Sequence, residues 1–229
     1  MCKALLLLAA AFGLAATAAS ATEVGPFKLG GEIKVGSEGI TKGISETEGN
    51  AQVVGAVTAT YKPFFAGIRL KNVKGSDGTD DQTQWFAGAK GDIAGFKASL
   101  QLLYKTNNNA RPGTDDDFYE WQSDISRTFN KSTTVKYTAI YSPDLSGATE
   151  EAWWHDLSVS QKLNAKWAVS GGVGIRRLSP ERDYTGYNLG ANYTVTKATG
   201  LDLRYYDTDK HEYGKRFGDR LVLTLTQKF

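Results

Sequence analysis

The sequence predicts an all-β protein, a single up-and-down antiparallel transmembrane β-barrel of about twelve strands. Three observations support this fold class. Apolar and polar residues alternate with period two in segment after segment. The connections between these segments are alternately long and short, and aromatic residues gather at the segment ends, as in the barrels of bacterial outer membranes.

The first 21 residues are predicted to be a Sec-type signal peptide, which leaves 22–229 as the mature barrel. Lys3 supplies the positive end, 4–16 the apolar core and 19–21 a small-residue cleavage site. Cys2 is the only cysteine, and it precedes the apolar core. The exported part is therefore expected to contain no disulfide, thiolate metal site or cysteine nucleophile.

The charge balance excludes one class of partner. The chain has 27 basic and 25 acidic residues, whereas a nucleic-acid-binding protein needs a clustered basic excess. A moderate average polarity does not exclude a membrane protein, because a barrel strand presents apolar side chains to lipid only at every second position.

The alternation defines twelve strands. Between Phe96 and Lys105, for example, Phe, Ala, Leu, Leu and Tyr alternate with Lys, Ser, Gln, Leu and Lys. The predicted strands are Leu29–Gly36, Ala51–Tyr61, Phe65–Asn72, Gln82–Gly91, Phe96–Lys105, Asp117–Thr128, Thr133–Tyr141, Ala152–Lys162, Trp167–Arg177, Tyr184–Thr194, Thr199–Asp207 and Phe217–Phe229. An even number is typical of single-chain bacterial barrels.

The connections indicate the orientation. The segment 37–50 is long and 62–64 is short, and this alternation continues to a long last connection at 208–216. Short periplasmic turns opposite longer outer loops are typical of outer-membrane barrels. Both ends of the mature chain are therefore expected in the periplasm, and the protein in the outer membrane of a Gram-negative bacterium.

Aromatic residues are predicted to form two girdles at the membrane interfaces, where a ring is buried while its polar atom stays wet. The periplasmic set is Tyr61, Phe65, Phe96, Phe129, Trp167, Tyr193 and Phe229. The outer set is Trp85, Tyr104, Tyr119, Trp121, Tyr141, Trp153, Trp154, Tyr184, Tyr187, Tyr205, Tyr206 and Phe217.

The last strand carries the most specific local signal. Leu221, Leu223, Leu225 and Phe229 share one face with Gln227, and the chain stops at the aromatic residue. This pattern resembles the signal read by the barrel-assembly machinery, which is therefore an expected partner.

Two parts of the chain resemble the Gcw-chp family of uncharacterised proteobacterial proteins. Lys42, Gly43, Ile44 and Ser45, with Glu46, resemble the family's Arg-Gly-Ile-Ser-Gln segment. The matching hairpin continues through Gly49-Asn50-Ala51-Gln52 and Phe65-Ala66-Gly67-Ile68, and the closing hairpin through Tyr205–Asp209, Gly218–Val222 and Thr226–Phe229. The resemblance implies a barrel in the outer membrane and no established activity.

The chain departs from this family at two places. Ser37-Glu38-Gly39 stands where the family usually has Ser-Asp-Tyr, and Lys42 stands where it has Arg. The second change matters if the motif binds a ligand bidentately, because lysine cannot reproduce the guanidinium fork.

The sequence does not favour an enzyme, and no catalytic residue or cofactor is predicted. His155 and His211 are the only imidazoles, and His155 with Ser158 or Ser160 is the only nearby pairing for acyl hydrolysis. Two outer-loop clusters, Asp77 with Asp80 and Asp81, and Asp115–Asp117, contain oxygen ligands for calcium but lack the spacing of a dedicated loop. Solvated loop charge is the simpler interpretation.

Basic residues of the last outer loop are candidates for pairing with lipopolysaccharide phosphates. They are Lys210, Lys215, Arg216 and Arg220. Ordinary surface solubility explains them equally well.

The inward face is expected to carry charges of both signs. The predicted lumen charges are Glu32, Lys34, Arg69, Lys97, Lys105, Asp124, Lys136, Asp156, Asp202 and Arg204. Small inward residues, Ser170, Gly172 and Gly174, are expected to leave space for water. A twelve-stranded barrel lies between barrels of about eight strands, which side chains fill, and those of sixteen or more, which hold a channel.

These observations favour a narrow pore for small hydrophilic solutes. The first alternative is a closed structural or surface-interaction barrel that acts through its outer loops. An outer-membrane enzyme acting on lipid and a soluble periplasmic ligand-binding barrel rank below it.

Overall fold

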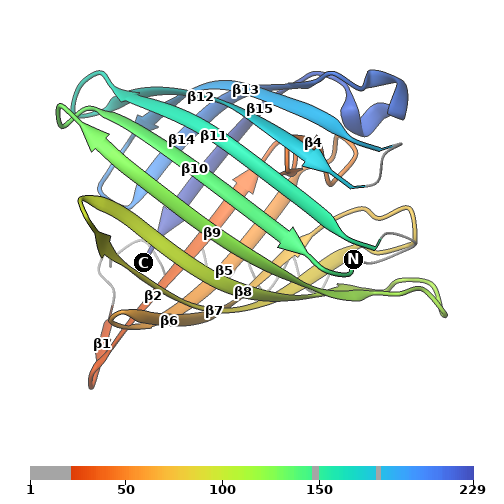
Figure 1. Cartoon of the computed structure of the whole chain (residues 1–229), viewed down its shortest axis with the longest axis horizontal. Helices are drawn as coiled ribbons and strands as arrows, with labels where there is room; N and C mark the ends of the chain where they lie inside the picture. Colours follow the sequence, from red (N-terminus) through yellow and green to blue (C-terminus); the bar gives the residue numbers. More distant parts are fainter. Residues whose placement is uncertain (1–21, 146–149, 179–181) are drawn as a thin grey trace.

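Twelve strands form a closed antiparallel barrel (Figure 1). The computed structural model describes residues 22–145, 150–178 and 182–229, so the predicted signal peptide lies outside the described residues. The barrel strands are β2 (Phe27–Gly36), β5 (Gln52–Tyr61), β6 (Phe64–Asn72), β7 (Asp81–Ile93), β8 (Phe96–Asn108), β9 (Asp117–Phe129), β10 (Thr133–Ser142), β11 (Ala152–Lys162), β12 (Trp167–Arg177), β13 (Tyr184–Thr194), β14 (Thr199–Thr208) and β15 (Arg220–Lys228).

The predicted all-β class and all twelve strands are confirmed, with ends that differ by a few residues. Each strand pairs with its neighbour in the chain because a short turn or a longer loop returns the chain antiparallel. None of the described residues belongs to a helix of the length and apolarity needed to cross a bilayer.

The barrel closes where β15 pairs with β2. This seam has five residue pairs, from Thr224 opposite Gly36 to Lys228 opposite Glu32. Phe229 extends it, because its backbone exchanges hydrogen bonds of 2.8 and 3.1 Å with Gly31. The Phe229 ring covers the space that a side chain at position 31 would occupy. Closure pairs the backbone N–H and C=O groups of the two edge strands, which an open sheet would expose to aggregation.

The two faces of the sheet differ as the alternation predicts. Exposed apolar side chains, such as those of Leu100, Leu189 and Leu223, lie on the outer face. The alternate residues face the interior, where Gln84, Lys105 and other polar side chains bond to one another. The outer face therefore has the composition of a surface in contact with lipid.

Five aromatic residues assigned to the girdles point inward instead or lie at the interior end of a loop. Trp154 is 7% exposed, and it faces the interior because its neighbour Trp153 faces outward. Phe65, Tyr184 and Tyr206 share this inward register, and Phe217 lines an interior cavity. Consecutive residues of a strand cannot both contact lipid, so this part of the girdle prediction was wrong.

Five short elements were not predicted as such. β1 (Thr22–Val24) continues the sheet beside β2, and the segment 37–50 contains the hairpin of β3 (Ile40–Thr41) and β4 (Ile44–Ser45). The last outer loop forms two 3₁₀ turns, η2 (His211–Tyr213) and η3 (Lys215–Phe217). The last strand consequently begins at Arg220 rather than at Phe217.

The assignment of faces predicts that lysine substitutions at two adjacent positions of β8 lower the stability by very different amounts. Leu100 is 52% exposed on the outer face, and Gln101 faces the interior. We expect Leu100→Lys to lower the free energy of unfolding in lipid by roughly 2–4 kcal/mol, because it places a charge against the bilayer core. Gln101→Lys, as the matched control, should have a much smaller effect. Urea unfolding in vesicles measures both, and equal losses would contradict the assignment.

Candidate functional site

The segment 37–50, which joins β2 to β5, folds into the barrel at the end where the longer connections lie (Figure 1). Thr41 pairs with Ile44, so the β3–β4 hairpin turns through the two residues Lys42 and Gly43. Both have positive φ, 49° and 82°. This is the backbone of a type I′ turn, for which glycine at the second position is preferred. The segment Lys42–Ser45, which resembles the Gcw-chp motif, therefore forms the tip of an inward hairpin.

The first attachment of this hairpin is a buried ionic cluster. The Glu120 side chain of β9 is 1% exposed and accepts from the ammonium groups of both Lys42 and Lys105. A carboxylate buried this deeply requires such partners, and removing one typically costs about 3–5 kcal/mol. Docking of the hairpin thus supplies part of the charge that Glu120 needs.

The second attachment is to β13 and β11. The hydroxyl of Tyr184 donates to the carbonyl of Lys42 at 2.9 Å. Gly43 lies against Gly186, where an added Cβ would come within 3.3 Å of the Gly186 Cα. The same Cβ would lie 3.6 Å from the Trp154 ring. A side chain at position 43 is therefore excluded both by the turn and by this close approach.

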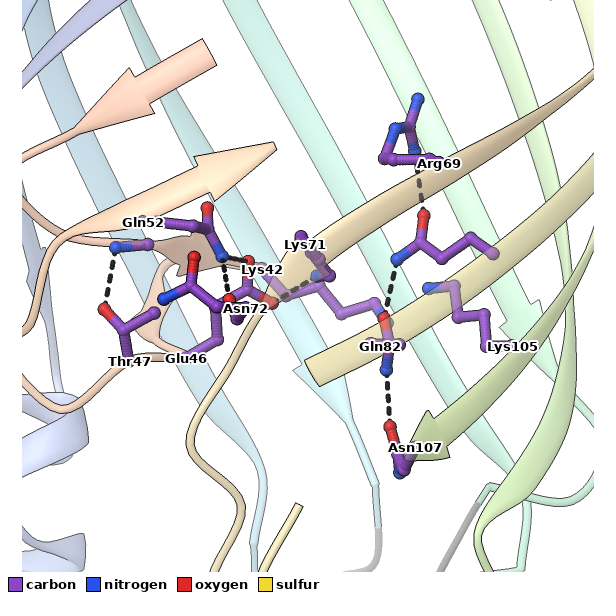
Figure 2. Close-up of polar contacts among 12 residues, drawn as sticks. Lys42, Glu46, Thr47, Gln52, Arg69, Lys71, Asn72, Gln82, Lys105 and Asn107 are labelled. Carbon is purple, nitrogen blue, oxygen red and sulfur yellow. Dashed lines mark hydrogen bonds and ion pairs between the residues drawn. The ribbon is translucent and has the colours of Figure 1, made fainter. Parts of the chain in front are cut away.

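The third attachment is to β6, shown in Figure 2. The Glu46 carboxylate accepts from Lys71 and, at 2.6 Å, from the amide of Gln52. A second turn shapes the base of the segment, where the Thr47 hydroxyl accepts from the Gly39 amide at 2.9 Å. β6, β9 and β13 are well separated around the twelve-stranded ring. The hairpin therefore spans the bore and narrows it.

A ladder of side-chain hydrogen bonds runs along the wall beside the docked hairpin (Figure 2). Arg69 donates to Gln84 at 2.9 Å, and Gln84 donates to Gln82 at 2.6 Å. Gln82 in turn donates to Asn107 at 2.6 Å. Buried polar groups of this kind need hydrogen-bond partners, and the ladder supplies them along β7.

A second polar cluster crosses three strands on the opposite wall. The Arg204 guanidinium donates to Asp202 at 2.9 Å, to Asn188 at 2.7 Å and to the Ser170 hydroxyl at 2.7 Å. On the neighbouring wall Asp124 accepts from Lys136 at 2.8 Å and from Thr138 at 2.6 Å. Charges of both signs therefore meet in pairs along the interior.

The register places the predicted lumen charges as follows. All ten have the inward parity of their strands: Glu32, Lys34, Arg69, Lys97, Lys105, Asp124, Lys136, Asp156, Asp202 and Arg204. Lys97 lies at the short-turn mouth, where it pairs with Asp92 at 3.3 Å and is largely exposed. Their part in moving a solute stays a prediction.

The small residues of β12 do not leave open space. A side chain at position 174 would overlap the Trp154 ring, and one at 172 would meet Asn188 and Ser158. Ser170 is occupied by its bond to Arg204. Larger neighbours occupy the space directly over these residues, so the gaps expected there are filled, whereas water elsewhere inside the barrel stays a prediction.

The remaining candidates are scattered. His155 faces outward, stacked on Trp153 at 5.5 Å, whereas Ser158 and Ser160 face inward, so the proposed hydrolase pairing does not form. His211 pairs with Asp207 at 2.6 Å on the outer loop.

The acidic loop residues also lie apart, and the described residues contain no group suited to a metal ion. Asp80 and Asp81 accept from asparagines at the end of β8, and Asp77 caps the amide of Thr79 at 3.0 Å. Asp115–Asp117 begin β9 or precede it. Calcium binding by either cluster gains no support from this placement.

The four basic residues of the last outer loop differ in their surroundings. Arg216 turns toward the barrel, where it bonds to the Lys74 carbonyl, and Arg220 pairs with Glu38 at 2.5 Å. Lys215 is exposed, whereas Lys210 is half-buried and pairs with Glu212 at 3.3 Å. Of the four, Lys215 best keeps the exposure that the predicted pairing with lipopolysaccharide requires.

Burial changes the proton affinity of the hairpin tip. Desolvation lowers the pKa of Lys42 from the usual 10.5 to about 7, although Glu120 opposes the change. The nearby charges of Lys105 and Arg176 lower the pKa further. Lys42 therefore exchanges its proton near neutral pH while the hairpin is docked.

The fold and its polar, constricted interior define an outer-membrane-type β-barrel with a porin-like architecture. A family model described as "Bacterial protein of unknown function (Gcw_chp)" matches residues 19–227. The chain belongs to this family, as the resemblance of its motifs indicated. A comparison with curated proteins found no match.

Solved structures of three outer-membrane proteins are similar in fold. The KdgM porin has 7% identity and a TM-score of 0.62, covering 87% of this chain and 99% of its own. The NanC porin has 8% identity and a TM-score of 0.59, with coverages of 87% and 98%. An outer membrane channel from Pseudomonas putida F1 has 11% identity and a TM-score of 0.52, with coverages of 92% and 97%. At these identities the likeness establishes the fold alone.

Gly43→Val is expected to release the hairpin. A non-glycine residue in this left-handed conformation costs about 1–2 kcal/mol before any clash with Gly186. Ser45, which is 1% exposed, provides a reporter as Ser45→Cys in the mature chain, where no other cysteine occurs. Thiol labelling at position 45 should accelerate by roughly tenfold or more in Gly43→Val. Unchanged labelling would show that docking does not need the glycine.

Docking of the hairpin should also strengthen with pH. The docked Lys42 has a pKa of about 7 and a solvated one 10.5, so the docked state holds fewer protons between these values. The free energy of docking is therefore constant below pH 7 and becomes more favourable as the pH rises above 7. Labelling of Ser45→Cys, normalised to exposed Asn50→Cys at each pH, should slow between pH 7 and 9. The same slope in Lys42→Met would assign the effect to another group.

Proposed function

We propose that this protein is an outer-membrane pore for small hydrophilic solutes, narrowed at its outer mouth by the hairpin of segment 37–50. The proposal includes export by the signal peptide of residues 1–21 and orientation with the short turns in the periplasm. Assembly would use the outer face of the last strand, where Leu221, Leu223, Leu225 and Phe229 lie.

The observation that carries the proposal is a series of polar cavities within the barrel. The outer cavity has a volume of about 510 Å³ and is lined by the hairpin and by Lys71, Lys105 and Arg176. A smaller one of about 220 Å³ lies beside Gly43, Trp154 and Asn188. A third, of about 340 Å³, opens at the short-turn end beside Glu32, Lys34 and Asp202. Space for water thus exists above, beside and below the constriction.

The shape of the barrel supports a narrow passage rather than a wide one. A ring of twelve strands is wider than one that side chains fill completely and narrower than a general porin. The hairpin occupies part of this width, and the ion pairs at Arg204 and Asp124 line the rest. A porin of the same fold, KdgM, has been solved in complex with disordered oligogalacturonate, which supports a hydrophilic solute.

Planar-bilayer recording of the refolded mature protein tests the pore. Discrete conductance steps are expected, and they should become larger when residues 39–49 are replaced by a short Gly-Ser linker, because the constriction is removed. The matched control replaces Asn130 and Lys131, two exposed residues of a short turn that line none of the three cavities named above, with Gly-Ser and should leave the steps unchanged.

Two outcomes would contradict the proposal. Insertion without conductance, in both the wild type and the linker variant, would favour a closed barrel that acts through its outer loops. Failure to insert would remove the membrane assignment.

A further inference from the structure

The outer cavity carries an excess of positive charge. Of the described residues that line it, seven are basic and two are acidic. The basic residues are Lys42, Lys71, Lys74, Lys105, Arg176, Arg182 and Arg216. They come from four strands or hairpins and three outer loops, so the charge surrounds the cavity rather than marking one wall.

The nearby carboxylates do not neutralise this set. Glu46 pairs with Lys71, and Glu120 is shared by Lys42 and Lys105. Glu48 is shared by Lys74 and Arg216, at 3.5 and 3.4 Å. Asp77 is engaged by the backbone of its own loop. Counting Glu48 and Glu120 with the lining residues, cations still exceed carboxylates by three.

The clearest unpartnered donor of this cavity belongs to Arg176. This residue is 4% exposed, and its Nη1 makes no hydrogen bond within the described part of the chain. A buried donor without an acceptor is costly unless another group satisfies it. Arg176 lines the outer cavity, so an anion bound there would supply the missing acceptor.

We propose that the outer cavity is a binding site for a small organic anion carrying two or three carboxylates, with Arg176 as its central ligand. This inference rests on the proposed pore and names the class of its solute, because the anion is the solute that the pore would admit. Arginine matches a carboxylate with two parallel hydrogen bonds.

The cavity fits an organic anion better than a bare inorganic ion. Its volume of about 510 Å³ lies in the range of small-molecule sites. Phe118, Tyr184 and Phe217 line it together with Ile44, which provides apolar contact for a carbon skeleton. Because Lys42 exchanges its proton near pH 7, the excess is two or three positive charges, which favours a multiply charged ligand over a single carboxylate.

Calorimetric titration of the purified mature protein in detergent at low ionic strength tests binding without requiring conductance. The probe is tricarballylate, and the controls are its neutral triamide and inorganic phosphate. Tricarballylate should bind, the triamide should not, and added salt should weaken binding because the cavity charges are screened. Phosphate binding as tightly as tricarballylate would overturn the carboxylate assignment.

Adjacent arginines of β12 provide the matched variants. Arg176→Gln should weaken tricarballylate binding by roughly tenfold, since it removes a charged hydrogen-bond donor. Arg177→Gln alters an exposed residue of the opposite face, paired with Asp183, and should leave binding unchanged. Equal effects of the two variants would overturn the proposal.

A second variant covers a failure of Arg176→Gln to fold. Lys74→Gln with Arg182→Gln changes two exposed side chains of the cavity rim and should weaken binding by roughly threefold. Unchanged binding in this variant would overturn the charge argument. Conductance with no binding of tricarballylate would overturn this inference alone, whereas binding without conductance would overturn only the pore.

Discussion

The outer end of the barrel depends on the buried carboxylate of Glu120. This group is almost fully removed from water and is held by Lys105 of the wall and Lys42 of the hairpin. Burial of a carboxylate is favourable only when opposite charges and hydrogen bonds replace its hydration. The Glu120 carboxylate of the wall therefore requires the Lys42 ammonium of the hairpin, and the hairpin requires Glu120 as its attachment. This mutual requirement turns a fourteen-residue loop into a fixed part of the interior.

Packing of large side chains against glycines gives the interior its remaining order. The Trp154 ring covers Gly174 and touches the hairpin at Gly43, and Phe86 lies over Gly67 in the same way. A barrel interior has no continuous apolar core, so each gap is filled by one large neighbour. The seam uses the same device on the outer face, where Phe229 covers Gly31. These contacts set where the bore is narrow and where cavities remain.

Period-two alternation was sufficient to predict the strands, their number and the inward charges, because a strand places alternate residues on opposite faces whatever its partners are. It could not predict the inward hairpin, since Lys42 meets Glu120 and Tyr184 only after the barrel closes. The Lys42-Gly43 pair, flanked by Ile40 and Ile44, could have indicated that hairpin from the sequence alone. The error at Trp154 arose because strand ends were considered without the parity that separates it from Trp153.

The constriction and the positive charge of the outer cavity have one physical origin. Docking of the hairpin engages the carboxylates of this region, since Glu46, Glu48 and Glu120 each pair with lysine or arginine. The ion pairs that narrow the bore therefore neutralise its carboxylates, and the cations in excess face the remaining space. Arg176 is the clearest of these, because it is buried beside the hairpin and its Nη1 has no partner among the described residues. A passage narrowed in this way would repel cations at the same place where it limits size.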